Sequence, residues 1–275
     1  MRLELYYPLW GNETTPLKEY CEKLVDAGYH GVEAFVPDEG LDGEEFRATL
    51  ERHGLKFVAQ HALTLESDFA KHRETLDRRL RRLAALQPEF LSSQTGRDYF
   101  SFDENRELLV LAEEISKDTG VPIIHETHRG RFSFAAHALR PYLEKLPELK
   151  LTLDISHWCV VSESLLEDQE GAVEMALNRA EHVHARVGGP QTPQIIDPRS
   201  PVWETEVSRH LMWWRQIAER YVREGRDRMT VTVEFGPVPY TNVHPQHGKP
   251  LVEQWEANLA IRELLTTHLS DLLEE

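Results

Sequence analysis

Four short apolar runs in the second half of the chain each end on a side chain that can bind a metal ion. These side chains are Glu126, Asp154, His184 and Glu234. Three carboxylates that converge in a partly buried place repel one another, and a cation is the natural compensation. One imidazole with three carboxylates suits a hard or borderline divalent ion. We therefore expect a divalent metal ion, first of all Mn²⁺, with Mg²⁺, Co²⁺ or Zn²⁺ as alternatives.

Parallel strands would bring these four ends together, and the chain has the pattern for them. Short apolar runs predict strands over 3–7, 31–36, 56–60, 89–92, 122–126, 150–154, 182–186 and 230–235. Amphipathic runs between them predict helices over 16–27, 43–53, 68–86, 104–119, 134–146, 165–179, 204–224 and 250–273. This alternation favours a single (β/α)₈ TIM barrel over an open doubly wound sheet, as one domain over residues 1–275. The active site of such a barrel lies at the carboxyl ends of its strands.

Composition excludes several classes of protein. The 275 residues include 31 Lys+Arg against 47 Asp+Glu, and the net charge of −16 opposes binding to nucleic acid. No apolar stretch is long enough for a membrane helix and the first residues do not resemble a signal peptide, so we expect a cytoplasmic protein without a membrane partner. The two cysteines, Cys21 and Cys159, are too few for a disulfide framework.

Four short motifs resemble those of a known family. They are 26–33 (DAGYHGVE) before and within the second strand, 154–157 (DISH), 182–184 (HVH) and 234–235 (EF). In this order and spacing they resemble the xylose isomerase-like TIM barrels, which include sugar phosphate isomerases and epimerases and the AP endonuclease family 2 proteins. The resemblance extends over nearly the whole chain and implies the same barrel fold.

The resemblance implies a role for each of these residues. Glu126, Asp154, His184 and Glu234 would bind the metal, and His157 of the D-x-x-H motif would hold a substrate oxygen. A metal that binds a carbonyl oxygen and the neighbouring hydroxyl acidifies the C–H bond beside them. Glu126 and Glu234 would then remove and return a proton through an enediolate, on a ketose or related polyol. Simple metal ligation by the two glutamates, without proton transfer, is the alternative.

Further polar residues near the strand ends are candidates for substrate binding. His61 ends the third strand, His128 follows Glu126 and resembles a substrate-facing histidine of some relatives, and Arg186 follows the metal histidine. A core or capping role for His61 and a surface ion pair for Arg186 are the alternatives. Arg129 and Arg131 either meet an anionic group of the substrate or pair with nearby carboxylates. No basic cluster follows the last two strands, which favours a free or glycosidic sugar over a sugar phosphate.

Three other functions compete with a sugar isomerase or epimerase. A lyase of the inosose dehydratase or 3-keto-glycoside eliminase type would use the same metal, base and acid. An endonuclease IV-like phosphodiesterase would need additional metal ligands and a basic face, which the acidic composition disfavours. A non-catalytic barrel would follow if the four residues bound no metal. The expected partner is a small sugar or sugar derivative, and the resemblance is compatible with a homo-oligomer.

Overall fold

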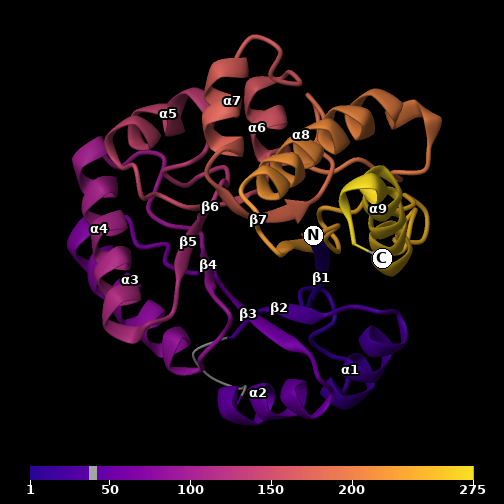
Figure 1. The fold of residues 1–275 in the computed structure, drawn as a ribbon, viewed down its shortest axis with the longest axis horizontal. Coiled ribbons are helices and arrows are strands. Elements are labelled where there is room, and N and C mark those ends of the chain that lie inside the picture. Colours follow the sequence, from indigo (N-terminus) through magenta and orange to yellow (C-terminus); the bar gives the residue numbers. More distant parts are fainter. Residues whose placement is uncertain (37–41, 275) are drawn as a thin grey trace.

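The strands of this chain form one closed parallel barrel (Figure 1). The computed structural model describes residues 1–36 and 42–274, and within them each strand pairs with the next while the last pairs with the first. The strands are β1 (Arg2–Pro8), β2 (Gly31–Phe35), β3 (Lys56–His61), β4 (Leu91–Ser93), β5 (Ile123–Glu126), β6 (Leu151–Leu153), β7 (Ala180–Ala185) and β8 (Arg228–Val233). The predicted (β/α)₈ TIM barrel is confirmed.

The helices lie in a ring outside the strands (Figure 1). They are α1 (Leu17–Asp26), α2 (Gly43–Arg52), α3 (Phe69–Ala85), α4 (Phe102–Thr119), α5 (Ala136–Lys145), α6 (Ser156–Ser162), α7 (Glu170–Leu177), α8 (Glu204–Arg223) and α9 (Gln254–His268), with short 3₁₀ turns at Pro201–Trp203 and Ser270–Leu272. Among the described residues, no helix has both the length and the apolar character needed to cross a membrane.

The helix predicted over 165–179 has the wrong bounds, and the prediction missed a second helix that precedes it. The structure has α7 over Glu170–Leu177 and, before it, the seven-residue α6 that follows β6 directly. Glu163 and Leu166 between them adopt left-handed backbone conformations, with φ of 49° and 61°, which interrupt helical geometry. This difference matters because α6 carries His157, one of the predicted substrate-binding residues.

Alternate residues of each strand point into the barrel or outward to the helices, as the two-residue period of a strand requires. In β7, His182 faces inward, where its ring nitrogens each lie 2.9 Å from a hydroxyl oxygen of β8, those of Thr230 and Thr232. The alternate residue Val183 belongs to the buried apolar cluster. The same alternation places polar residues inside the barrel toward the carboxyl ends of its strands.

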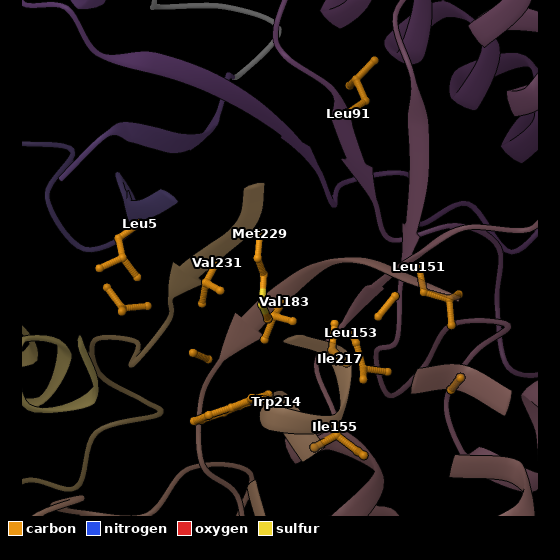
Figure 2. Close-up of a cluster of buried hydrophobic side chains, with 14 of the residues drawn as sticks. Leu5, Leu91, Leu151, Leu153, Ile155, Val183, Trp214, Ile217, Met229 and Val231 are labelled. Atoms are coloured by element: carbon orange, nitrogen blue, oxygen red, sulfur yellow. The ribbon is translucent and has the colours of Figure 1, made fainter. Parts of the chain in front are cut away.

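The outward residues of the last strands form the core with α8. Val183, Met229 and Val231 lie on the side of the barrel wall where Trp214 and Ile217 of α8 are found (Figure 2). Trp214 is 1% exposed and is among the largest fully buried side chains of the described chain. Burial of such aromatic surface stabilises the wall that carries His184 and the end of β8.

We predict that Trp214→Ala lowers the free energy of unfolding by about 3–5 kcal/mol, because it removes a fully buried aromatic side chain and leaves a cavity. Chemical denaturation followed by circular dichroism measures this change. Val202→Ala is the matched control, because Val202 is 77% exposed and its truncation is expected to change stability by no more than about 0.5 kcal/mol. Equal effects of the two substitutions would contradict the packing described above.

Candidate metal centre

The four predicted metal ligands lie at the carboxyl ends of four consecutive strands. Glu126 is the last residue of β5, Asp154 directly follows β6, His184 lies near the end of β7, and Glu234 directly follows β8. All four side chains are buried. The parallel pairing of β5 through β8 brings them to one edge of the barrel.

The structure places donor atoms of these four residues close together. His184 Nδ1 lies 2.9 Å from Glu234 Oε2 and 3.8 Å from Glu126 Oε1. One ligand atom each from Glu126, Asp154 and His184 lie within 4.8 Å of one another. The set predicted from the sequence is therefore a spatial cluster.

The unpaired atoms of this cluster fit a divalent cation. Among the residues that the structure describes, Glu126 Oε2, His184 Nδ1 and Glu234 Oε2 are buried and have no hydrogen-bond partner. Buried polar atoms without partners are costly and rare in folded proteins. Carboxylate oxygens and an imidazole nitrogen are also the donor types that Mn²⁺ and related ions accept. Three buried atoms without a well-formed hydrogen bond, two of which (His184 Nδ1 and Glu234 Oε2) lie 2.9 Å apart, are what a metal ion would satisfy.

Glu33, from β2, orients the imidazole of His184. Both carboxylate oxygens of Glu33 lie 3.0 Å from His184 Nε2, and Glu33 Oε2 also accepts a hydrogen bond of 2.5 Å from Thr232. With the Nε2 proton directed at Glu33, Nδ1 is the nitrogen turned toward the other carboxylates. Burial raises the pKa of Glu33, but the His184 and His182 imidazoles outweigh it and hold the pKa well below its usual value.

The buried glutamates Glu126 and Glu234 have opposite pKa shifts. Burial raises the pKa of Glu126 to about 8, with the charges of Glu234 and Asp154 adding to the effect and His184 opposing it. Burial also raises the pKa of Glu234, but His184 and Arg186 lower it more, so the net shift is downward. For His184, burial opposes protonation while Glu234 and Glu33 raise the pKa well above its usual value. One glutamate thus favours the protonated form and the other the ionised form, the division of labour expected of an acid and a base.

Asp154, one of the four residues of the cluster, also forms an ion pair with Arg186. Its Oδ1 accepts hydrogen bonds from the backbone N–H and the hydroxyl of Ser156, at 3.1 and 2.5 Å. Its Oδ2 accepts from the Arg186 guanidinium, which also lies 3.8 Å from Glu234 Oε2. Arg186 is buried, so its positive charge compensates part of the negative charge of the cluster.

Three of the four residues predicted to act on substrate lie beside the cluster. His157 Nε2 is 2.8 Å from Arg186 Nη2, and the rings of His157 and His128 lie 3.9 Å apart between centroids. Burial holds the pKa of His157 well below its usual value, helped by His128 and Arg186. His61 is placed differently, because its two ring nitrogens contact the hydroxyls of Ser93 and Thr64 at 2.9 and 2.7 Å.

A cavity of about 340 Å³ opens onto the cluster. One side of it is polar and includes Gln60, Gln94, Glu126, His128, Arg186 and Glu234. The lining of the cavity also includes apolar side chains, those of Leu9, Trp10, Phe35, Ala62 and Leu63. Trp10 packs edge-on against Tyr240, with ring centroids 5.1 Å apart, and a side chain at Gly236 would meet the Trp10 ring at 2.2 Å. The loop after β8, which carries Tyr240, therefore shapes the cavity as expected of long loops at the catalytic end.

Two glutamines are part of the site although the sequence reasoning did not identify them. Gln94 donates to Glu126 Oε1 at 3.3 Å, and Gln60 donates to Glu234 Oε1 at 3.4 Å. Gln60 pairs in register with Phe35, which also lines the cavity. The two-residue period of the strand could have identified Gln60. Gln60 is in phase with the inward-facing residues Glu33 and Phe35, whereas His61 is one residue out of phase.

The model of the xylose isomerase-like TIM barrel family matches residues 21–211 of the chain. The chain belongs to this family. No curated protein matches it in sequence. Its resemblance to solved structures covers almost the whole barrel, at identities so low that they show the fold alone.

Three solved structures are examples of proteins with a similar fold. A xylose isomerase-like TIM barrel protein from Mycobacterium smegmatis in complex with magnesium is 11% identical, with a TM-score of 0.64 over 99% of this chain and 98% of that chain. The 3-keto-D-glucoside 4-epimerase of E. coli is 14% identical, with a TM-score of 0.59 over 97% and 100%. Endonuclease IV from Thermus thermophilus is 16% identical, with a TM-score of 0.58 over 98% and 100%. Proteins that share this fold therefore include an epimerase and an endonuclease.

We predict that Glu33→Gln lowers the affinity for Mn²⁺ by about 10–100-fold, because the neutral amide orients His184 less firmly and makes it a weaker donor. Isothermal titration of the metal-free protein measures the affinity. Glu13→Gln is the matched control, because Glu13 is an exposed carboxylate at the same cavity and its loss changes the net charge equally. A Glu33→Gln protein with the affinity of the control would rule out this orienting role.

We also predict that the affinity for Mn²⁺ rises with pH between about 6 and 8. The pKa values of Glu126 and His184 are raised, so both hold protons below this range, and a metal must displace these protons to bind. The expected change is about tenfold or more per pH unit while these two groups lose their protons. Titrations at pH 6, 7, 8 and 9 test this, and an affinity independent of pH would show that neither group is a ligand.

Proposed function

We propose that this protein is a divalent-metal-dependent sugar isomerase or epimerase that works through an enediolate. The observation that carries the proposal is the pair Glu126 and Glu234. These residues line one cavity, each has a buried oxygen without a hydrogen-bond partner among the described residues, and their pKa values shift in opposite directions. Such a pair is suited to remove a proton from carbon and return one.

The metal would be held by Glu126, Asp154, His184 and Glu234. When bound there, a divalent ion polarises a substrate carbonyl and so acidifies the C–H bond next to it. We favour Mn²⁺, and Mg²⁺, Co²⁺ and Zn²⁺ use the same donor types.

The side chains around the cavity supply the remaining steps. The Glu234 carboxylate takes the proton from the carbon beside the carbonyl, and the electron pair of that C–H bond moves to the carbonyl oxygen as the enediolate forms. Glu126, ionised once a metal displaces its proton, takes a proton from the neighbouring hydroxyl or from solvent and delivers it to carbon, and Glu234 releases its proton at the end of the cycle. Arg186 and His157 hold substrate oxygens and offset the negative charge that develops on them. His128 extends this polar side of the cavity, and His61 is proposed to support it from the adjoining hydroxyl network.

Gln60 and Gln94 keep the two glutamates in place. Each donates an amide N–H to one oxygen of its glutamate, which leaves the other oxygen directed at the substrate. Because a carboxylate with one oxygen held has fewer accessible orientations, proton transfer at the free oxygen occurs from a defined position.

A lyase is the second candidate, because it begins with the same proton removal and differs only in expelling a neighbouring group. The probable 3-DHS dehydratase from Bacillus anthracis shares the fold, with a TM-score of 0.59 at 15% identity. The partner that we propose is a small sugar or sugar derivative in the cytoplasm, with no nucleic acid or membrane partner.

The decisive experiment is incubation of the Mn²⁺-loaded protein with ketoses, inososes and 3-keto-glycosides in D₂O, followed by NMR. We predict deuterium incorporation at a carbon beside the carbonyl, with an epimer or isomer as product; an unsaturated product would identify the lyase. His157→Ala should still bind the metal but lower the rate by about 10²-fold or more, because it lacks a group that holds a substrate oxygen. Exchange at an unchanged rate in Glu126→Gln and Glu234→Gln would contradict the acid-base assignment.

A further inference from the structure

Arg129 is a cation beside the cavity that pairs with no carboxylate in the part of the chain that the structure describes. It is half-buried, and its Nη2 donates to the Tyr240 hydroxyl at 3.0 Å while its Nη1 lies 3.1 Å from His157 Nδ1. Within residues 1–36 and 42–274, no carboxylate forms an ion pair with it. Arg186, in contrast, is paired with Asp154. Arg129 therefore contributes an uncompensated positive charge next to the polar side of the cavity.

His157 lies between the two guanidinium groups. Its Nδ1 faces Arg129 Nη1 at 3.1 Å and its Nε2 faces Arg186 Nη2 at 2.8 Å. A neutral imidazole has one N–H and one lone pair, and guanidinium groups only donate. With the proton on Nε2, which lies 3.5 Å from Asp154 Oδ2, Nδ1 accepts from Arg129. This contact holds Arg129 beside His157 without neutralising its charge.

Both guanidinium groups lie close to the ring of Tyr240. Its ring centroid lies 5.0 Å from the Arg129 guanidinium carbon and 4.7 Å from that of Arg186. Tyr240 itself lines the cavity, as does His128, the neighbour of Arg129 in the chain. The uncompensated cation is thus fixed at the cavity by contacts on two sides.

The charge and shape of this group indicate which anion it would accept. One uncompensated guanidinium balances one negative charge, and its planar pair of N–H donors matches the two oxygens of a carboxylate. A phosphate dianion would call for a second cation or a nest of backbone N–H groups. The exposed carboxylate of Glu13 at the cavity is solvated and opposes the anion only weakly.

We propose that the substrate is a sugar acid, and that Arg129 selects it by binding its carboxylate. Arg129 is then the specificity-determining residue, while the keto-alcohol part of the substrate lies at the metal centre. The placement of the keto-alcohol part at the metal centre rests on the proposed isomerase or epimerase function. Binding of the carboxylate by Arg129 does not depend on turnover of the substrate.

The test compares matched ligands by isothermal titration of the Mg²⁺-loaded full-length protein. D-glucuronate provides a carboxylate, D-glucose is its neutral counterpart, and D-glucose 6-phosphate provides a phosphate. We expect D-glucuronate to bind about tenfold or more tightly than D-glucose, as for a charge-assisted pair of hydrogen bonds. In Arg129→Gln this preference should fall to about one, with the affinity for D-glucose changed by no more than about twofold.

Two further variants serve as controls. Arg129→Lys keeps the charge without the planar donor pair, so we expect an intermediate preference. Arg199→Gln removes an exposed arginine that pairs with Asp197 on the loop after β7, and it should keep the wild-type preference.

Three results would overturn the proposal. One is the absence of a preference for the acid in the wild-type protein. Another is a preference that survives in Arg129→Gln, because the carboxylate would then bind elsewhere. The third is tighter binding of D-glucose 6-phosphate than of D-glucuronate, lost in Arg129→Gln, which would identify a phosphate site. Because binding requires no turnover, a retained acid preference without isotope exchange would refute only the proposed function, and exchange on neutral sugars without an acid preference would refute only this inference.

Discussion

Four buried carboxylates share the carboxyl end of this barrel, and their mutual repulsion is the constraint on which the site depends. Glu33 and Glu234 are balanced mainly by His184, which lies between them, and Asp154 is balanced by Arg186. Glu126 has no comparable partner, and this is why its pKa rises while that of Glu234 falls. A divalent cation would complete the compensation and replace the proton that Glu126 otherwise retains. The proposed metal binding and the difference between the two glutamates thus have one electrostatic origin.

The barrel holds these charges together through the alternation of its strands. Several inward positions are polar and are supported by a neighbour on an adjoining strand, as His182 is by Thr230 and Thr232. The support extends outward from the centre. Arg131 donates to the Gln94 side chain and to the carbonyl oxygens of Ala62 and Thr64, and Gln94 in turn donates to Glu126. Because each group is held by another, the glutamates keep their positions without being buried against apolar atoms.

The cavity combines this polar floor with an apolar wall, and the two sides suit different parts of a sugar derivative. Substrate oxygens can meet the Arg186 guanidinium, which contacts His157, while the C–H faces of a ring can pack against Trp10 and Leu63. The acidic net charge of −16 would repel an anionic ligand in general. Arg129, which pairs with no carboxylate among the described residues, gives such a ligand the proposed place to bind beside the cavity.

The sequence by itself determined the barrel and the four residues at its centre. Strand alternation and helix periodicity are local, and parallel strands necessarily bring their carboxyl ends to one edge, so Glu126, Asp154, His184 and Glu234 could be predicted to meet. Only the tertiary structure decided how the neighbouring residues pair. Gln60 rather than His61 faces the cavity, because a shift of one residue reverses the direction of a strand side chain. Arg186 meets a carboxylate, Arg131 meets carbonyl oxygens and Arg129 meets the Tyr240 hydroxyl and His157. These pairings depend on distances between strand ends and loops, which are set by closure of the barrel and by the packing of α6 and which no local pattern encodes.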